Sequence, residues 1–333
     1  MITESVIKAV RGETLSAEEA EGAFTEIMAG EAGEVRTAAL LTALHIKGVS
    51  ISELTGAARA MRGASCKIAA PADAVDIVGT GGDGFGTFNV STTAAVIAAG
   101  AGVVIAKHGN RASTSRSGAA DCLAALGYDL AKTAAEVEQS IAKNGIGFCF
   151  ANLFHPAMKY AAPVRKQLPF RTVFNLLGPL TNPAGVRRHA LGVYSPDVVP
   201  LYLGVLQASA TKHALIFCGP DGLDELGLSG ASRVTELFAD GTVKEFTFEP
   251  QKVFGATYPM ESIRGGSPSE NAALTMAVLQ GKEKGPYRLA ACLNASAALV
   301  AGDRAKTLEE GLSIAARSID SGAALEKLKQ LVS

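Results

Sequence analysis

Glycines, hydroxyls and cations gather in one acid-free part of the chain. Asp83 and Asp121 bound 37 consecutive residues, 84–120, without Asp or Glu, although 32 of the 333 residues are acidic. The stretch opens from a glycine-rich segment, residues 79–92, and closes through a basic, hydroxyl-rich segment, residues 107–118. Backbone N–H groups, hydroxyls and cations held together are the groups that bind a polyanion, so the sequence predicts a phosphate site.

The glycine-rich segment has the position of an anion-binding loop. Five glycines occupy the eight positions 79–86, between a β-branched run and an Ala-rich helical run. Successive N–H groups and the N-terminus of the following helix then point at one spot. Tight turns alone would explain one or two of these glycines but not five.

Two common nucleotide motifs do not fit this loop. Gly79, Gly81 and Gly84 match G-x-G-x-x-G, but a dinucleotide fold needs an acidic residue about 20 positions further on to hold the ribose hydroxyls. That position falls in the acid-free stretch. A Walker A loop needs a closing Gly-Lys-Ser/Thr, which this segment lacks.

The basic segment supplies complementary groups. Four polar side chains follow a strand that we predict at residues 102–106: Lys107, His108, Asn110 and Arg111. Ser113 and Ser115 add hydroxyls. Ligands of open α/β sheets bind beyond the carboxyl ends of the strands, so we expect this loop to face the glycine loop across one crevice. An exposed basic loop is the usual alternative, but the acid-free surroundings favour phosphate.

Adjacent carboxylates follow another predicted strand, at residues 214–218. Asp221, Asp224 and Glu225 lie in one turn. Mg²⁺ prefers one or two carboxylates together with waters and phosphate oxygens. The segment alone is equally compatible with a solvated turn, but the phosphate-binding segments elsewhere favour a metal.

Arg165 lies in a proline-rich segment, residues 155–186, that has helical pieces between its prolines. A guanidinium there can clamp a planar carboxylate through two parallel hydrogen bonds. A surface salt bridge explains the residue equally well, so both interpretations stay open.

The elements that must position these groups divide the chain in two. Residues 1–70 predict helices only, with capping boxes that begin at Ser16 and Ser50. From residue 74, β-branched runs alternate with helical runs, which predicts a larger α/β domain, residues 71–333, around a mostly parallel sheet. The proline-rich segment 155–186 is expected to cross back to the helical domain as a hinge or cleft wall.

The alternation gives approximate bounds. Predicted strands lie at residues 75–78, 102–106, 146–150, 190–194 and 214–218, and predicted helices at 92–99 and 119–126. Asp240-Gly241 between alternating apolar residues predicts a hairpin over 234–248. The last 65 or so residues predict helices again.

Composition narrows the function classes. A net charge of −1 gives no whole-protein attraction to nucleic acid or membrane. No signal peptide is visible and no apolar run reaches membrane-spanning length. Five widely spaced cysteines predict buried free thiols in a reducing compartment: Cys66, Cys122, Cys149, Cys218 and Cys292. We therefore expect a cytoplasmic protein.

Together these segments resemble the anthranilate phosphoribosyltransferase family over essentially the whole chain. Its motifs occur in order at residues 79–83 (GTGGD), 107–111 (KHGNR), 155–159 (HPAMK), 175–183 (NLLGPLTNP), 222–225 (GLDE) and 264–266 (RGG). The glycine loop is partly shared with nucleoside phosphorylases of the same fold. The chain departs from the family pattern at Gly227, where a Ser is expected, and at residues 152–154, beside the outer anthranilate channel.

The resemblance implies an activity. The family transfers the phosphoribosyl group of phosphoribosyl pyrophosphate (PRPP) to the amine of anthranilate in tryptophan biosynthesis. It implies a fold of the nucleoside phosphorylase and phosphoribosyltransferase type, two Mg²⁺ ions per subunit, and a homodimer formed through the helical domain.

The resemblance also implies site residues. PRPP would contact Gly79, Gly82, Asp83, Thr87, Asn89, Val90, Ser91, Thr92, Lys107, His108, Gly109, Asn110, Arg111, Ala112, Ser113, Thr114, Ser115 and Ala119. Anthranilate would contact Gly79, His108, Asn110, His155 and Arg165. The metal ligands would be Ser91, Asp224 and Glu225. No side chain is assigned as acid or base, and Asn110, Arg165 and His108 would position the nucleophile.

Two other functions remain to be weighed. A pyrimidine nucleoside phosphorylase would use phosphate on a nucleoside at a similar loop. A non-catalytic relative could bind nucleic acid through the basic loop, but Asp224, Glu225, Arg165 and the near-neutral net charge argue against it.

Overall fold

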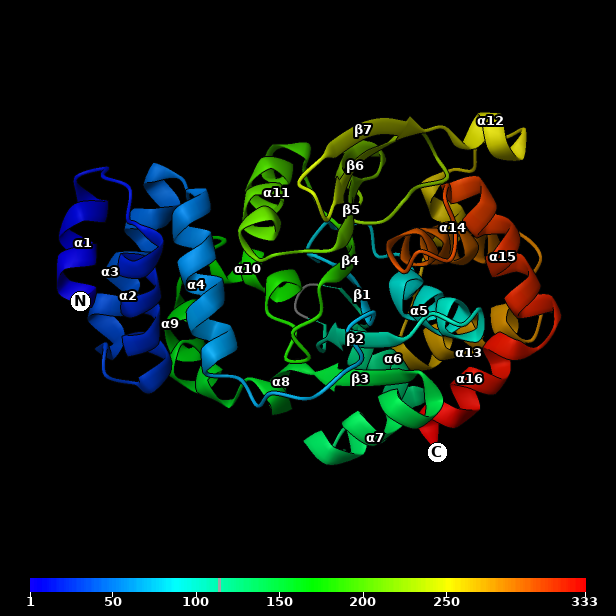
Figure 1. Ribbon diagram of the computed structural model, residues 1–333, viewed down its shortest axis with the longest axis horizontal. Helices are drawn as coiled ribbons and strands as arrows, with labels where there is room; N and C mark the ends of the chain where they lie inside the picture. The colour runs from blue at the N-terminus through cyan, green and yellow to red at the C-terminus, as the bar shows by residue number, and fades with distance from the viewer. Residues whose placement is uncertain (113–114) are drawn as a thin grey trace.

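The computed structural model describes residues 1–112 and 115–333. Two predicted PRPP contacts, Ser113 and Thr114, lie outside the described residues. Figure 1 shows the N-terminal helices at one end of the molecule, the sheet in the middle and the C-terminal helices at the other end.

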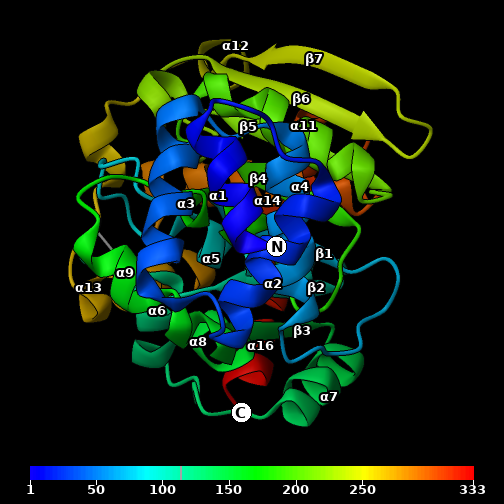
Figure 2. The same cartoon turned by 90° about the vertical axis from the view of Figure 1, so that its left-hand side faces the viewer.

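The N-terminal end is a helical lobe, seen face-on in Figure 2. Its helices are α1 (Ile2–Val10), α2 (Ala17–Ala29), α3 (Gly33–Lys47) and α4 (Ile51–Gly63). Both predicted capping boxes are present, since the Ser16 and Ser50 side chains accept hydrogen bonds from the N–H groups of Glu19 and Glu53. Each such cap stabilises its helix by about 1 kcal/mol.

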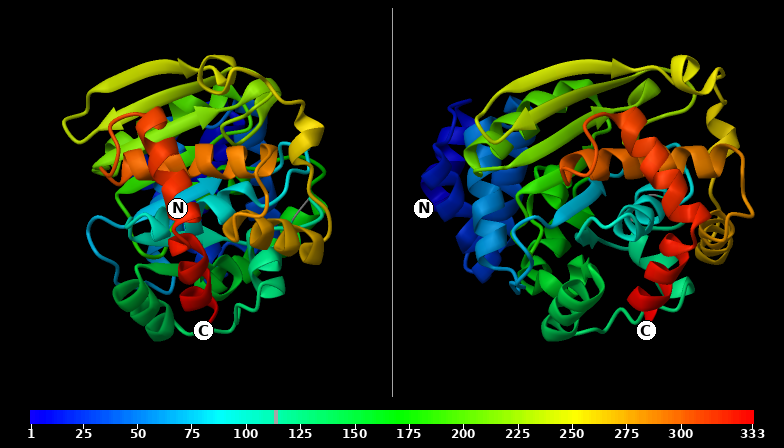
Figure 3. Two further views of the ribbon diagram at one scale, coloured as in Figure 1. Left: turned by 90° about the vertical axis from the view of Figure 1, so that its right-hand side faces the viewer. Right: turned by 45° about the vertical axis from the view of Figure 1, so that its right-hand side comes forward.

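Seven strands of the described chain form one sheet in the order β3-β2-β1-β4-β5-β6-β7. They are β1 (Val75–Gly79), β2 (Ile105–Gly109), β3 (Ile146–Phe150), β4 (Arg188–Gly192), β5 (His213–Cys218), β6 (Ser232–Phe238) and β7 (Val243–Phe248). The first five are parallel, and the predicted hairpin β6–β7 adds an antiparallel edge (Figure 3). The predicted helical-plus-α/β fold with a mostly parallel sheet is confirmed.

Two predicted strand bounds are wrong. β2 begins at Ile105 instead of residue 102 and continues to Gly109, so Lys107 and His108 lie in the strand and not after it. The reason is local: Gly102 has φ 92°, and the N–H of Val103 donates to the oxygen of Ala98, so these residues end the preceding helix. Similarly, β4 covers 188–192 where we predicted 190–194.

The sheet has its topological switch point between β1 and β4. From β1 the chain builds outward through β2 and β3, then returns to β4 on the other flank of β1. In open α/β sheets the crevice at such a point binds the ligand.

Alternate strand residues enter two different cores, as the pleat requires. Leu215 and Phe217 of β5 pack in a core with α5 (Val90–Gly100) and the C-terminal helices. Ala214 and Ile216 pack in a core with the helical lobe. The sheet is therefore buried on both faces.

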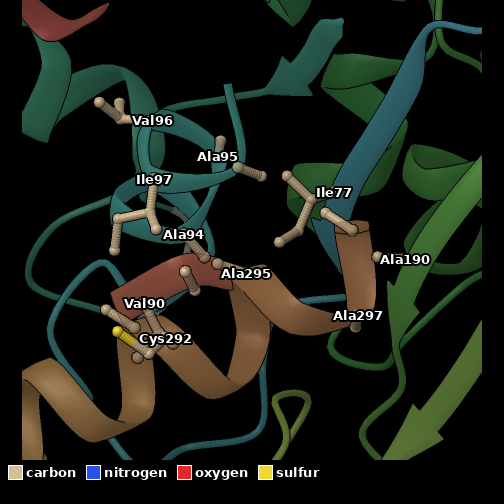
Figure 4. Packing of buried hydrophobic residues seen from close by; sticks show 14 of the residues in the cluster. Ile77, Val90, Ala94, Ala95, Val96, Ile97, Ala190, Cys292, Ala295 and Ala297 are labelled. Carbon is tan, nitrogen blue, oxygen red and sulfur yellow. The ribbon is translucent and has the colours of Figure 1, made fainter. Parts of the chain in front are cut away.

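Small residues bring α5 close to α14 (Pro286–Ala301). Figure 4 shows Ala94 of α5 next to Ala295 of α14, with Ala95 directed toward Ile77 of β1. Close packing holds α5 firmly behind the glycine loop.

The proline-rich segment returns to the helical lobe. It contains η1 (Pro156–Tyr160), α9 (Ala162–Gln167), α10 (Phe174–Leu177) and η2 (Gly178–Leu180). Val164, Phe174 and Leu177 are buried in one core with Phe24 and Leu40 of the lobe. Its role as a hinge stays a prediction.

The remaining helices complete the layers. They are α6 (Ala119–Ala125), α7 (Ala134–Asn144), α8 (Ala151–Phe154), η3 (Pro196–Val198), α11 (Val199–Ala208), η4 (Pro220–Gly222), α12 (Pro250–Phe254), η5 (Met260–Ile263), α13 (Pro268–Leu279), α15 (Leu308–Asp320) and α16 (Ala323–Val332). The helical C-terminus was predicted. Among the described helices, none combines the length and apolar character needed to cross a membrane.

The five thiols are free. Cys122, Cys149, Cys218 and Cys292 are buried as predicted, but Cys66 is exposed because it lies in the connection between α4 and β1.

Candidate active site

Asp224 sits at the switch point, in a space that two glycines leave open. Gly79 and Gly192 are partners at the carboxyl ends of β1 and β4. A Cβ on Gly79 would lie 2.9 Å from Asp224 Cγ, and a Cβ on Gly192 would lie 2.6 Å from the carbonyl carbon of Asp224. Glycine at both strand ends is therefore what admits the carboxylate to the crevice.

The carboxylate of Asp224 holds the glycine loop. Its Oδ2 accepts a 2.6 Å hydrogen bond from the N–H of Gly81, and its own N–H lies 3.4 Å from Asp83 Oδ2. Asn294 of α14 holds the turn that follows Asp224. Its Oδ1 accepts a hydrogen bond from the N–H of Leu226, and its Nδ2 donates one to the oxygen of Leu226. Asp221, by contrast, is exposed and lies outside this arrangement.

Glu225 meets the start of α5. Its Oε1 accepts a 3.0 Å hydrogen bond from the N–H of Ser91, in the first turn of that helix, where the helix dipole favours negative charge. The buried side chain of Lys107 also lies at the start of α5. Its Nζ donates a hydrogen bond to the oxygen of Ile77 at 2.6 Å and lies 3.4 Å from Ser91 Oγ. The predicted metal ligands Ser91, Asp224 and Glu225 are thus brought together.

Burial perturbs all three ionisable groups. It raises the pKa of Asp224 to about 7, with a further contribution from the Asp83 charge. Burial and the Asp224 charge raise the pKa of Glu225 well above its ordinary value. Burial lowers the pKa of Lys107, although the nearby carboxylates oppose it. Two buried carboxylates, with the Lys107 ammonium nearby but hydrogen-bonded to Ile77, favour the arrival of a further cation.

The donor set suits a hard cation. Carboxylate and hydroxyl oxygens are the ligands of Mg²⁺, which completes its shell with water and phosphate oxygens. Within residues 1–112 and 115–333, His, Cys, Asp and Glu form no cluster of three or more suited to a metal. Such a cluster would be expected of a zinc site but not of a magnesium site shared with a phosphate ligand.

Asp76 is a buried carboxylate below the site that sequence reasoning missed. Its Oδ1 accepts a 3.0 Å hydrogen bond from the N–H of His108, and burial raises its pKa to about 6. The β1–β2 ladder pairs Val75 with Ile105, and beyond that pair Asp76 and Lys107 bridge the two strands through their side chains. The signal available in the sequence was an acidic residue, Asp76, within an otherwise apolar strand.

The basic loop is folded around Asp121. Oδ2 of Asp121 accepts hydrogen bonds from the N–H groups of Ala112 at 2.9 Å and Gly118 at 3.0 Å, and Oδ1 pairs with Arg111 at 2.8 Å. Asn110 lies exposed beside them. The acid that ends the acid-free stretch therefore shapes the loop.

Asn89 joins the basic loop to the glycine loop. Its Oδ1 accepts hydrogen bonds from Ser117 Oγ at 3.0 Å and from Asn271 Nδ2 at 2.8 Å. Further along, the N–H of Gly265 donates to the oxygen of Gly86 at 2.8 Å, and Thr87 bridges to Arg264. The two predicted phosphate segments therefore lie side by side.

The structure places the predicted PRPP residues at two neighbouring strand ends. Residues 79–92 follow β1 into α5, residues 107–109 end β2, and residues 110–112 and 115 lead to Ala119, the first residue of α6. These contacts with PRPP stay predictions.

The predicted anthranilate residues fall into two environments. The rings of His108 and His155 lie 5.1 Å apart, and His108 Nδ1 lies 3.1 Å from the oxygen of Gly178. Burial lowers the pKa of His108 to about 3 and that of His155 to about 4, so both rings are neutral at pH 7.

Arg165 lies on α9. Its guanidinium carbon is 5.2 Å from the ring centre of Phe174, its Nε is buried, and burial lowers its pKa. Among the described residues Arg165 forms no ion pair, so the salt-bridge interpretation finds no partner there.

The departure at Gly227 has a steric reason. A Cβ there would lie 2.8 Å from Pro220 Cγ, and the N–H of Gly227 donates to Ser232 Oγ at 3.0 Å. The turn that carries Asp224 and Glu225 is thus packed around a glycine.

Comparisons with known proteins identify the family. Two family models match, "Glycosyl transferase family, helical bundle domain" over residues 4–65 and "Glycosyl transferase family, a/b domain" over residues 71–325. Anthranilate phosphoribosyltransferase of Rhodopseudomonas palustris (strain BisB18) is 50% identical over 98% of this chain and 95% of its own length. That of Rubrobacter xylanophilus is 47% identical over 100% of this chain and 97% of its own.

Solved structures give the same result. The anthranilate phosphoribosyltransferase of Thermus thermophilus has a TM-score of 0.93 and 45% identity, covering 98% of both chains. The Saccharomyces cerevisiae enzyme in complex with PRPP and Mg has a TM-score of 0.91 and 31% identity, covering 99% of this chain and 96% of that one. With a glycine-framed carboxylate at the switch point and relatives that match it from end to end, this chain belongs to the anthranilate phosphoribosyltransferase family.

Proposed function

We propose that this chain transfers the phosphoribosyl group of PRPP to the amine of anthranilate, giving N-(5-phosphoribosyl)anthranilate and pyrophosphate in tryptophan biosynthesis. One observation carries the proposal: Asp224 and Glu225 are buried at the switch point and hydrogen-bonded to Gly81 and Ser91, at the two ends of a phosphate-binding loop. A polyphosphate with its metal is the ligand that such a loop and such carboxylates suit together.

PRPP occupies the crevice between the glycine loop and the basic loop. The N–H groups after β1, the N-terminus of α5 and the cations of the basic loop bind its phosphates. The described members of the proposed set are Gly79, Gly82, Asp83, Thr87, Asn89, Val90, Ser91, Thr92, Lys107, His108, Gly109, Asn110, Arg111, Ala112, Ser115 and Ala119.

Two Mg²⁺ ions per subunit bind with PRPP, and Ser91, Asp224 and Glu225 hold them. The burial of the two carboxylates beside one another supports this assignment. When bound, Mg²⁺ neutralises negative charge on the departing pyrophosphate.

Anthranilate binds beside the ribose, where Arg165 and Asn110 orient it and Gly79, His108 and His155 line its site. A guanidinium without an ion-pair partner among the described residues suits a carboxylate ligand. The neutral histidines offer hydrogen bonds without competing charge.

The reaction is a substitution at C1 of the ribose. The amine nitrogen attacks C1, the C1–O bond breaks with its electron pair on pyrophosphate, and the nitrogen then loses a proton to water. An aromatic amine is already neutral at pH 7, so the chain's residues act by orientation and by preorganised electrostatics.

The protein acts as a homodimer in the cytoplasm. Apolar side chains exposed on α1 and α3 support a dimer through the helical lobe: Ile7, Val10, Val35 and Ile46. Free thiols support a reducing compartment.

A fluorescence assay tests the function. Anthranilate fluorescence is followed after addition of PRPP and Mg²⁺, and we expect a loss that EDTA abolishes. No loss refutes the proposal. Phosphorolysis of thymidine or uridine would instead support a nucleoside phosphorylase, and salt-sensitive DNA binding without turnover would support a nucleic-acid-binding protein.

A further inference from the structure

Arg171 connects three parts of the chain around the crevice. It lies in the proline-rich segment between α9 and α10, and its Nη2 donates to the main-chain oxygen of Gly82 in the glycine loop. Its guanidinium carbon also lies 4.1 Å from the ring centre of Tyr194, just after β4. No sequence motif marked this exposed arginine.

The neighbours of Arg171 fix where its backbone lies. The ring of Phe170 stacks on His45 of α3, with centroids 4.4 Å apart and planes 17° apart. On the other side, the N–H of Thr172 donates to Asn175 Oδ1 at 2.9 Å. Arg171 therefore extends from an anchored position towards the glycine loop.

The contact fixes one peptide of that loop. In a trans peptide the C=O and the following N–H point in opposite directions. An arginine that holds the oxygen of Gly82 therefore turns the N–H of Asp83 the other way. Gly82 has φ 74°, and a Cβ there would lie 3.1 Å from Arg171 Nη2, so the close approach depends on glycine.

The rest of the loop is held independently. The N–H of Thr80 donates to the oxygen of Gly192 at 3.0 Å, and the N–H of Gly81 donates to Asp224 Oδ2 at 2.6 Å. The N–H of Tyr194 in turn donates to Thr80 Oγ1 at 3.2 Å. Other groups thus hold Thr80 and Gly81, and Arg171 holds the peptide that links Gly82 to Asp83.

We propose that Arg171 is a positioning residue for PRPP: supported by the ring of Tyr194, it holds the Gly82 carbonyl so that the N–H of Asp83 is directed to the phosphate. This inference rests on the proposed function, which places PRPP at the glycine loop. The planar guanidinium can stack on an aromatic ring and still donate along its edge, which a lysine ammonium cannot do in the same way.

Hydrogen–deuterium exchange of residues 80–88 tests the contact in the free protein. We expect about tenfold faster exchange in Arg171→Gln and in Tyr194→Leu, and unchanged exchange in Tyr194→Phe, which keeps the ring. Arg187→Gln is the matched control, because Arg187 is also exposed and also donates to a main-chain oxygen, that of Ala210, near the opposite end of β4.

Steady-state kinetics test the positioning role. Arg171→Gln and Tyr194→Leu are expected to raise the PRPP KM about tenfold, which corresponds to the loss of one charged hydrogen bond. The anthranilate KM and kcat should stay within about twofold, because neither residue contacts that substrate.

Each other result overturns the inference. If hydrogen exchange is unchanged in both Arg171→Gln and Tyr194→Leu, the contact does not order the loop. This conclusion holds whether or not the wild-type enzyme uses PRPP. A raised PRPP KM in Arg171→Gln with a wild-type value in Tyr194→Leu would mean that the guanidinium binds phosphate directly. Absence of turnover by the wild type refutes the proposed function, and the exchange data still decide whether Arg171 orders the loop.

Discussion

Four ionisable side chains are buried under the proposed PRPP site, and each is shifted toward its neutral form. Burial raises the pKa values of Asp76, Asp224 and Glu225 and lowers that of Lys107. Burying unpaired charge is costly, and each of these four groups is hydrogen-bonded to a main-chain group. A site built in this way favours ligands that bring both cations and phosphate.

Gly79→Ala tests the space around Asp224. The added Cβ would lie 2.9 Å from Asp224 Cγ, so the carboxylate must move. We expect kcat/KM to fall on the order of 10²-fold, because a displacement of about 1 Å at a site has that cost. Gly63→Ala is the control, since nothing lies within 4 Å of a Cβ there. Equal activity of both variants in the fluorescence assay would contradict the role of Gly79.

Arg165→Ala tests the carboxylate clamp. The anthranilate KM should rise about tenfold or more, while the PRPP KM changes little, because the lost interaction is one charged hydrogen-bonding partner. Arg165→Lys should restore only part of the affinity, since an ammonium cannot form two parallel hydrogen bonds. An equal rise in both KM values would remove the assigned role.

At the scale of elements, the short helix α6 organises the basic loop. Asp121, in its first turn, gathers the main chain of Ala112 and Gly118 and the side chain of Arg111. Although burial acts to raise it, the pKa of Asp121 is held below its ordinary value by these hydrogen bonds, so the carboxylate stays charged at pH 7.

Asp121→Ala should therefore loosen the loop without unfolding the protein. We expect the PRPP KM to rise about tenfold and Tm to fall by only a few degrees, about 1–2 kcal/mol of stability. Asp121→Asn keeps one acceptor and should have an intermediate KM. A PRPP KM at the wild-type value in Asp121→Ala, measured beside its Tm, would show that the loop needs no such anchor.

The elements were largely predictable because their signals are local. Alternating apolar and Ala-rich runs predicted the strands and helices, and the Ser-x-x-Glu pattern predicted the caps at Ser16 and Ser50. The start of β2 was misplaced because Val103 and Val104 are β-branched residues that favour a strand, whereas the turn at Gly102 lets the N–H of Val103 bond back to Ala98 of α5.

The site was predictable only where its residues follow strand ends or belong to a family motif. Asp224 and Glu225 could be named from sequence, but the two glycines that make room for Asp224 lie far apart in the chain, and their pairing becomes visible only in the sheet register. Arg171 acts through a main-chain group and carries no sequence signature, whereas Asp76 had only the weak signal of an acidic residue in an apolar strand.

At the scale of the whole molecule, one ionic cluster ties the β5–β6 pair to the end of α14. His213 lies between two carboxylates, with Nε2 2.9 Å from Glu236 Oε1 and Nδ1 2.9 Å from Asp303 Oδ1. Arg188 pairs with Asp303 at 2.6 Å. Both ring nitrogens face acceptors, so the doubly protonated imidazolium satisfies them best.

This cluster predicts a pH-dependent stability. Burial alone lowers the pKa of His213, but its hydrogen bonds to Glu236 and Asp303 outweigh that effect and raise it. The stabilisation is therefore complete below the unfolded pKa of about 6.5 and is lost as pH rises through the folded pKa. For Asp303 burial acts to raise the pKa, but Arg188 and His213 lower it, so its share is complete above an unfolded pKa of about 3.9.

Thermal unfolding of wild type and His213→Gln between pH 5 and pH 9 checks this. The Tm difference should be largest, about 2–4 °C, near pH 5 to 6 and should shrink toward pH 9. A Tm difference that is constant over the whole range would show that His213 stabilises the hairpin by packing and not by charge.

The contact between Gly227 and Pro220 restricts how this sequence can change over time. A serine at 227 would place its Cβ 2.8 Å from Pro220 Cγ, although the family pattern has serine there. The two positions are therefore coupled: we expect Gly227→Ser to be tolerated in this chain only together with a change at residue 220 or in its turn. The constraint comes from packing between residues 227 and 220 and not from any contact with the substrate.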